Sequence, residues 1–194
     1  MILETIVTTQ NALGQPHIAP MGVHTRPDNN HDEAYDFMIL PFRPSATLDN
    51  ILSTHTAVIN FCDDVRVFAG CLTGRRDWPV NASQKTAGCY LAAALAHTEV
   101  ALVNVEDDGE RPKLFCKSVY TVHHKSFKGF NRAQYSVLEA AILVSRLDRL
   151  PQEKVRQELD YLRIGVDKTA GDRELEAWQW LMAAVDAFYS GVKA

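Results

Sequence analysis

Short runs rich in Val, Ile, Thr and aromatic residues follow one another through the first two-thirds of the chain, and this pattern predicts a β-sheet. Turn-forming residues at 11–16 and 107–110 connect two pairs of neighbouring runs as hairpins. Connections this short require antiparallel pairing. The predicted strands are residues 4–9, 17–25, 35–40, 57–61, 99–106 and 113–125.

Apolar residues at helical spacing interrupt this sheet twice and then take over the chain. We expect helices at residues 45–54 and about 85–97, each able to cap an open end of a barrel. After Asn131 the spacing stays helical, with apolar stripes that begin at Tyr135, Val155 and Leu175. The simplest architecture is α+β, an antiparallel six-stranded barrel-like sheet followed by an all-helical segment.

Composition and charge narrow the class of protein and the choice of partner. The 194 residues are 46% hydrophobic, as in an ordinary globular protein, and carry a formal net charge of −4. There is no excess of Lys and Arg to attract a polyanion, so nucleic acid is not an expected partner. The first residues do not resemble a secretory signal, and no apolar run approaches the roughly 18 residues of a membrane span. We therefore expect a cytoplasmic protein with no membrane partner.

Several familiar site motifs are missing from the sequence. It has neither G-x-G-x-x-G nor G-x-x-x-x-G-K-[ST], which argues against a Rossmann site and a P-loop, and it lacks the G-x-S-x-G of serine hydrolases. His123 and His124 are neighbours on a predicted strand, where their side chains point to opposite faces, so we expect no metal site. The cysteines form no C-x-x-C pair and are expected to be buried, reduced thiols: Cys62, Cys71, Cys89 and Cys116.

The segment from Pro41 to Asn50 follows a strand and opens a helix, and it offers donors for an anion. Ser45 is a good N-cap, and the first-turn amides beyond it have no intrahelical acceptor. Together with the hydroxyl of Thr47 and the cationic fork of Arg43, these groups suit a phosphate at the positive end of the helix dipole. The alternative is an ordinary capped helix with a surface arginine.

The segment from Gly14 to Val23 is a strand with a proline and a glycine inside its apolar run. Pro20 removes a hydrogen-bond donor from the strand, and Gly22 removes a side chain, which suits an edge where something flat approaches the backbone. A planar ring is one interpretation, and an irregular edge strand is the other.

The order of several segments resembles that of the FMN-binding split-barrel proteins, in particular a branch of the flavin-reductase-like group of the DUF447 type. The resemblance covers nearly the whole chain, and no single motif is diagnostic, but the order of the motifs is specific. The segments that carry it are residues 4–9, 14–23, 45–51, 58–61 with Asp63 and Asp64, 130–140, and 145–146.

This resemblance implies a homodimer with one FMN in a cleft between the subunits. It assigns residues 1–128 to an FMN-binding split-barrel domain and residues 129–194 to a helical segment packed on the barrel. It places the FMN phosphate at Arg43, Ser45, Thr47 and Asn50. It places the ring beside Ala19, Pro20, Met21, Gly22 and Val23. Asn131 and Arg132 offer a further anion contact, for which the alternative is an N-cap followed by a solvent-facing arginine.

A flavin cofactor also explains why no acid–base pair stands out, since FMN carries hydride chemistry and the protein binds and orients it. The expected function is an FMN-dependent oxidoreductase of the flavin-reductase type that acts on a small molecule, such as a reduced carrier or a pterin-like substrate. The sequence identifies no catalytic residue, and the segment from Thr73 to Thr86 matches nothing familiar. The alternatives are a non-catalytic flavin-binding or flavin-sensing protein and a split barrel that binds deazaflavin or haem.

Overall fold

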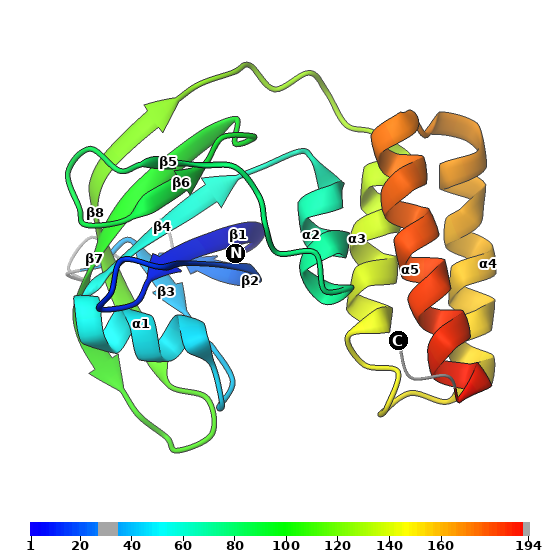
Figure 1. Ribbon diagram of the computed structural model, residues 1–194, viewed down its shortest axis with the longest axis horizontal. Helices are drawn as coiled ribbons and strands as arrows, with labels where there is room; N and C mark the ends of the chain where they lie inside the picture. Colours follow the sequence, from blue (N-terminus) through cyan, green and yellow to red (C-terminus); the bar gives the residue numbers. More distant parts are fainter. Residues whose placement is uncertain (27–34, 192–194) are drawn as a thin grey trace. The chain divides into compact units, whose positions relative to one another are not determined.

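The computed structural model describes residues 1–26 and 35–191, and six strands of these ranges form a closed antiparallel barrel (Figure 1). The hydrogen-bonded order around the barrel is β1-β2-β3-β8-β7-β4, which joins the first strand to the fourth. This confirms the predicted α+β class and the six-stranded antiparallel barrel. The strands are β1 (Ile2–Gln10), β2 (Pro16–Thr25), β3 (Phe37–Ile39), β4 (Thr56–Phe61), β7 (Ala96–Glu106) and β8 (Lys113–His123).

Alternate residues of the strands fill the barrel with apolar side chains. Val7, Val23 and Ile59 are fully buried there. The helix α1 (Ala46–Thr54) adds Leu48 and Ile51 to the same cluster and packs against β1, β2 and β4. Each aliphatic side chain buried in this way stabilises the barrel by about 1.5 to 3 kcal/mol. The helix predicted at residues 45–54 is therefore confirmed as a barrel cap.

The helix predicted at residues 85–97 is wrong. A two-stranded sheet of β5 (Val80–Ala82) and β6 (Cys89–Leu91) stands there instead, and β7 begins at Ala96. The N–H groups of residues 84–86 donate to the side chain of Glu99, and that of Leu91 donates to Asn60. The side chains of Glu99 and Asn60 accept from N–H groups that would otherwise bond within a helix. These long-range hydrogen bonds therefore outweigh the helical spacing of the apolar residues.

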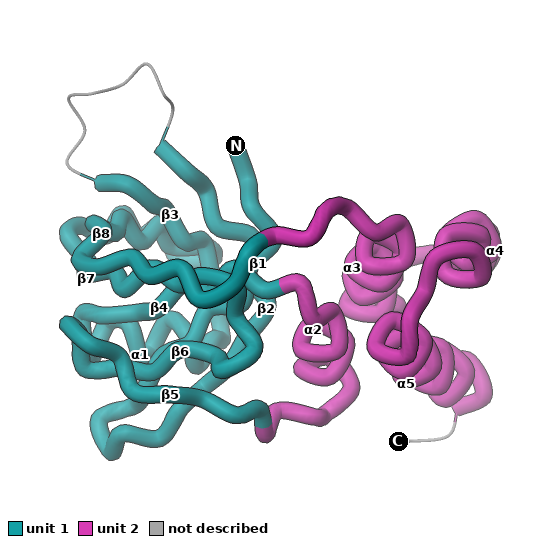
Figure 2. Tube along the Cα trace, turned by 90° about the horizontal axis from the view of Figure 1, so that it is seen from above, with its two compact units in different colours: residues 1–62, 78–126 teal, residues 63–77, 127–194 magenta. Residues whose placement is uncertain are grey.

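Residues 63–77 and 127–194 form a second compact unit, which is helical (Figure 2). Its helices are α2 (Val65–Leu72), α3 (Arg132–Val144), α4 (Gln152–Thr169) and α5 (Asp172–Ser190). The last three confirm the helices predicted after Asn131, whereas α2 was not expected. Val65 and Ala69 of α2 belong to the core of this unit. Residues 63–77, which lie inside the expected barrel domain of residues 1–128, therefore group with the helices by their contacts.

The four cysteines are free thiols. Cys71, Cys89 and Cys116 are buried, as expected, and Cys62 is half-buried. Burial raises the pKa of Cys71 to about 11 and that of Cys116 to about 12. Both thiols are therefore protonated and unreactive at neutral pH.

The described residues contain neither a membrane-spanning helix nor a cluster of metal ligands. No helix in ranges 1–26 and 35–191 is both long and apolar enough to cross a membrane. Over the same ranges, no three His, Cys, Asp or Glu side chains gather as a set that could hold a metal ion.

Candidate functional site

Ser45 caps the amino-terminal end of α1, as the sequence predicts. Its backbone is extended, and its Oγ accepts a hydrogen bond from the N–H of Leu48 at 3.2 Å. Intrahelical bonding starts with the N–H of Asp49, which donates to the carbonyl of Ser45 at 3.0 Å. The N–H groups of Ala46 and Thr47 precede that bond and have no acceptor within the helix. An anion at this end would meet two backbone donors and the positive end of the helix dipole.

Arg43 is held by an aspartate of another loop. Its guanidinium donates two hydrogen bonds of 2.7 Å to the carboxylate of Asp107 and one of 2.9 Å to the carbonyl of Gly109. The hydrogen bond from Arg43 lowers the pKa of Asp107 to about 2, and Asp107 in turn raises the pKa of Arg43. An arginine has five N–H donors, so a phosphate contact would use those that Asp107 and Gly109 leave.

Thr47 and Asn50 lie on the buried side of α1, with exposed fractions of 1% and 8%. Nδ2 of Asn50 donates to Oγ1 of Thr9 on β1 at 3.0 Å. The carbonyl of Asn50 accepts bonds from the hydroxyls of Ser53 and Thr54. Asn50 therefore ties α1 to the barrel, and a contact of either residue with phosphate stays a prediction.

The five residues predicted beside a ring divide between the two faces of β2. Met21 and Val23 contribute to the barrel core, and Val23 is fully buried. Ala19 shares their face, because alternate residues of a strand point the same way. Pro20 and Gly22 point to the outer face of the barrel. Of these five residues, only Pro20 and Gly22 are therefore on the face that a ligand outside the barrel could contact.

Pro20 and Gly22 fit an exposed strand edge. In the described structure β3 pairs with β2 only at residues 23–25, so Pro20 lies where its missing N–H breaks no bond to β3. A Cβ at Gly22 would lie 3.1 Å from Cγ2 of Ile2 on β1. The neighbouring strand by itself accounts for the glycine, and a ring at this edge stays a prediction.

Asn131 and Arg132 begin α3 in the helical unit. Oδ1 of Asn131 accepts from the N–H of Ala133 at 2.8 Å, and its Nδ2 donates to the carbonyl of Thr169 at 2.9 Å. The N-cap alternative is thus observed for Asn131, whose amide is used at both ends. Arg132 is exposed, and its contact with an anion stays a prediction.

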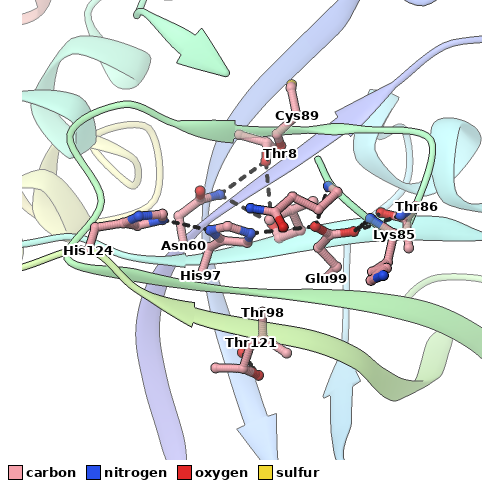
Figure 3. A network of polar contacts seen from close by, with 12 residues as sticks. Thr8, Asn60, Lys85, Thr86, Cys89, His97, Thr98, Glu99, Thr121 and His124 are labelled. Carbon is pink, nitrogen blue, oxygen red and sulfur yellow. Dashed lines mark hydrogen bonds and ion pairs between the residues drawn. The ribbon is translucent and has the colours of Figure 1, made fainter. Parts of the chain in front are cut away.

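A buried polar cluster that the sequence did not predict lies on the outer face of the barrel (Figure 3). Glu99 of β7 is fully buried, and its carboxylate accepts bonds from the N–H groups of Gln84, Lys85 and Thr86 and from the Thr86 hydroxyl, at 2.7 to 2.9 Å. Burial by itself raises the pKa of Glu99, but these hydrogen bonds outweigh it, so the pKa lies below its usual value. Glu99 is therefore ionised at neutral pH.

Three stacked rings continue this cluster toward the surface. His97 is fully buried, and its Nε2 lies 3.6 Å from Oε1 of Glu99, just beyond hydrogen-bond distance. Its Nδ1 lies 2.8 Å from Nε2 of His124, which is exposed. The ring of Tyr90 stacks on both, with centroid distances of 4.2 Å to His97 and 4.9 Å to His124.

Asn60 and Thr8 fasten β6 over the same face. Oδ1 of Asn60 accepts from the N–H of Leu91 at 2.8 Å, and its Nδ2 donates to the carbonyl of Ile6 at 2.9 Å. The hydroxyl of Thr8 donates to the carbonyl of Cys89. Strand register places Asn60 directly beside His97, so these side chains share one face. The available signal was two polar residues, His97 and Glu99, at alternate positions in an apolar run, but nothing in the sequence indicates their partners.

The unassigned segment contributes to a hollow within the helical unit. The guanidinium of Arg75 lies over the ring of Trp180, 4.5 Å from its centroid, and Nη1 of Arg75 donates to the hydroxyl of Thr73. A cavity of about 800 Å³ opens beside them, lined mainly by small and apolar residues such as Leu72 and Phe188. Its size and lining are those of a small-molecule cavity, although nothing in it selects a ligand.

Comparison with protein families identifies both parts of the chain. Residues 3–125 match the family described as protein of unknown function (DUF447) N-terminal domain, and residues 131–183 match protein of unknown function (DUF447). A comparison with curated proteins finds no match.

Solved structures with the same fold include flavoproteins. An FMN-bound DUF447 protein from Methanosarcina mazei is similar with a TM-score of 0.77 and 19% identity over 94% of both chains. The 2-nitrobenzoate 2-nitroreductase of Pseudomonas fluorescens has a TM-score of 0.52 and 19% identity over 62% of this chain and 64% of its own. A Shewanella frigidimarina protein assigned as a flavin reductase with a split barrel domain has a TM-score of 0.54 and 12% identity, over 68% of this chain and 74% of its own. At these identities the similarity shows a split-barrel, flavin-reductase-like fold.

Proposed function

We propose, from the premise that this chain belongs to the DUF447 family, that it binds FMN and is an FMN-dependent oxidoreductase of the flavin-reductase-like type. The observation that carries the proposal is the FMN-bound DUF447 protein, whose similarity extends over 94% of both chains. The capped end of α1 supports it, because the N–H groups of Ala46 and Thr47 have no acceptor within the helix and a phosphate could accept from them.

Two separate groups of residues would bind the phosphate and the ring of FMN. The first turn of α1 would hold the phosphate, with Ser45 fixing the geometry of that turn and Arg43 adding charge. Pro20 and Gly22, on the outer face of β2, would flank the ring. Bound FMN supplies hydride transfer, and the protein supplies orientation and exclusion of water. The substrate would be a small molecule, and a homodimer would complete the ring site from a second copy.

Substitution of Ser45 by Asp separates phosphate binding from helix capping. Asp is as good an N-cap as Ser, so α1 should keep its stability. Its negative charge opposes a phosphate dianion at the same place. We expect FMN affinity to fall by about two powers of ten, or about 3 kcal/mol, and the affinity for riboflavin, which lacks the phosphate, to stay unchanged.

The matched control is Asn131→Asp, which introduces the same charge at the N-cap of α3. FMN affinity should stay within about twofold in this variant, or about 0.4 kcal/mol. Isothermal titration of each folded variant with both ligands decides the matter. Loss of FMN binding in Asn131→Asp but not in Ser45→Asp would assign the phosphate to α3, and failure of the wild-type protein to bind FMN would end the proposal.

Turnover distinguishes an oxidoreductase from a flavin carrier. The FMN-loaded protein should bleach near 450 nm when NADH or NADPH is added without oxygen, and it should recover its colour with a two-electron acceptor. Bound FMN that neither pyridine nucleotide reduces would support a storage or sensing role instead. Light scattering of the same sample tests the dimer, which a stable, FMN-binding monomer would contradict.

A further inference from the structure

The carboxylate of Glu99 uses its two oxygens unequally. Oε2 accepts three hydrogen bonds, from the N–H groups of Lys85 and Thr86 and from the Thr86 hydroxyl. Within the described structure, Oε1 accepts one hydrogen bond, from the N–H of Gln84. Since a carboxylate oxygen has two acceptor positions, Oε1 keeps one of them. That oxygen is the one that lies 3.6 Å from Nε2 of His97.

The charge of Glu99 determines which nitrogen of His97 carries the proton. Nε2 is buried and has no hydrogen-bond partner within the described structure, and a lone pair at this place would face a negative charge. A proton on Nε2 is therefore favoured, which leaves Nδ1 as an acceptor. The contact of 2.8 Å between the two histidines is then a bond that Nε2–H of His124 donates to Nδ1 of His97.

The same reasoning leaves Nδ1 of His124 with a lone pair on an exposed ring. We propose that His124 is an acid–base group that exchanges a proton with a small molecule at an ionisable oxygen or nitrogen, and that His97 and Glu99 are its positioning residues. The proposal rests on His97 and Glu99 of β7 and on His124, which directly follows β8, and it does not require flavin binding.

The proposed exchange needs no reactant besides the small molecule and water. The lone pair of Nδ1 takes the proton, and the electrons of the broken bond stay on the oxygen or nitrogen of the molecule. The protonated ring of His124 still donates Nε2–H to His97, whose own N–H faces ionised Glu99. Burial lowers the pKa of His97, and the nearby His124 lowers it further, against the opposite effect of Glu99. The buried ring of His97 therefore disfavours a second proton, and water reaches the exposed ring of His124 directly.

Packing alone does not explain this arrangement. Tyr90 lies nearly parallel to both imidazoles, at 12° to His97 and 9° to His124, and a phenylalanine at position 97 would stack equally well. A buried imidazole nitrogen without a hydrogen bond is unfavourable, and an apolar ring would avoid that cost. A histidine at this position has one property that an apolar ring lacks. Its Nδ1 accepts from Nε2–H of His124, and the charge of Glu99 favours that arrangement.

The tautomer of His97 provides the first test, and it needs no substitution. Nitrogen-15 chemical shifts of the wild-type protein at neutral pH should show the proton of His97 on Nε2. In Glu99→Gln, with the charge removed, the population with the proton on Nδ1 should rise. A wild-type protein with the proton of His97 on Nδ1 would overturn the proposal, because His124 would then be the acceptor of the pair.

Chemical labelling provides the second test, with His123 as an internal control, since it is also exposed and adjacent in the chain. A donated Nε2–H makes the other nitrogen of His124 more nucleophilic. At pH 8 we expect diethyl pyrocarbonate to modify His124 about fivefold faster than His123, a factor that corresponds to roughly 1 kcal/mol. Peptide mass spectrometry over time measures both rates.

Two substitutions should abolish this difference in labelling. Glu99→Gln removes the charge, and His97→Phe keeps a ring for Tyr90 but no acceptor for His124. Both should bring His124 to the rate of His123, whereas the exposed change Glu106→Gln should leave the fivefold ratio intact. Equal rates in the wild-type protein, or a ratio that survives both substitutions, would show that the cluster is packing only. FMN titration of the same samples reports separately on the proposed function.

Discussion

The amino-terminal end of α1 and the cluster around Glu99 belong to the same barrel unit, but they satisfy their polar groups in opposite ways. At α1, Ser45 accepts from the N–H of Leu48, and the N–H groups of Ala46 and Thr47 have no acceptor within the helix. At the cluster, one buried carboxylate accepts four hydrogen bonds from a three-residue stretch, Gln84–Thr86.

This difference indicates that the end of α1 is suited to binding a ligand, whereas the Glu99 cluster stabilises the fold. Open donors at a helix end cost little, because water replaces a missing ligand, and they remain available to an anion. A buried ionised carboxylate must be satisfied by the protein itself, so its loss is felt by the fold. His97 differs from Glu99, because its Nε2 is buried without a hydrogen-bond partner in the described structure.

The largest expected effect follows from Glu99→Ala, which leaves three backbone N–H groups without their acceptor. We expect the free energy of unfolding to fall by about 2 to 4 kcal/mol. Urea denaturation measures it. Glu106→Ala, which breaks an exposed pair with Lys113, is the control and should change stability by less than about 0.5 kcal/mol. A similar small loss for both variants would contradict the structural role assigned to Glu99.

Ser45→Ala should cost less than Glu99→Ala, since only one N-cap bond is lost. We expect about 1 kcal/mol in the same denaturation experiment. Ser45→Asp restores an N-cap acceptor and should recover the wild-type midpoint. A loss at Ser45 as large as that at Glu99 would break the comparison, because it would mean that α1 is held mainly by its cap rather than by Leu48 and Ile51.

The pH dependence of stability should depend on His97. Burial lowers its pKa in the folded state, with His124 acting in the same direction, so the unfolded chain binds a proton first as the pH falls. This contribution is fully present above the unfolded pKa of about 6.5 and is lost as the pH falls through the folded pKa. His97→Phe should therefore flatten the curve of unfolding free energy below about pH 6.5. His24, whose pKa burial also lowers, leaves a residual slope. An unchanged slope would count against a buried neutral His97.

The smallest expected effect is a change in FMN affinity that tests whether Arg43 contacts the phosphate. Asp107→Asn and Asp108→Asn each remove one negative charge from the same turn, but only Asp107 holds Arg43. Both changes should leave the melting temperature nearly unchanged, because both residues are exposed. If Arg43 contacts the phosphate, Asp107→Asn should tighten FMN about threefold more than Asp108→Asn, or roughly 0.7 kcal/mol, in fluorescence titrations. Equal affinities would leave Arg43 with a structural role alone.

The sequence predicted those features whose cause is local. Period-two runs gave the barrel strands, helical spacing gave α1 and α3 to α5, and the N-cap preference of Ser45 located the start of α1. Each depends on residues within a few positions of one another, so no knowledge of the fold was needed. The same locality allowed the α1 site to be proposed before its geometry was known.

Tertiary structure decided what depends on partners far apart in the chain. Glu99 and Asn60 captured the N–H groups of residues 84–86 and 91, and they turned an apparent helix into a loop and a strand. Asp107 accepts hydrogen bonds from Arg43, which lies 64 positions away in the chain, and His124 contacts His97, which lies 27 positions away. Hydrophobic spacing records which side of an element is buried, but it does not record which polar group will find which acceptor. Those choices are made when the barrel closes and brings β4, β7 and β8 side by side.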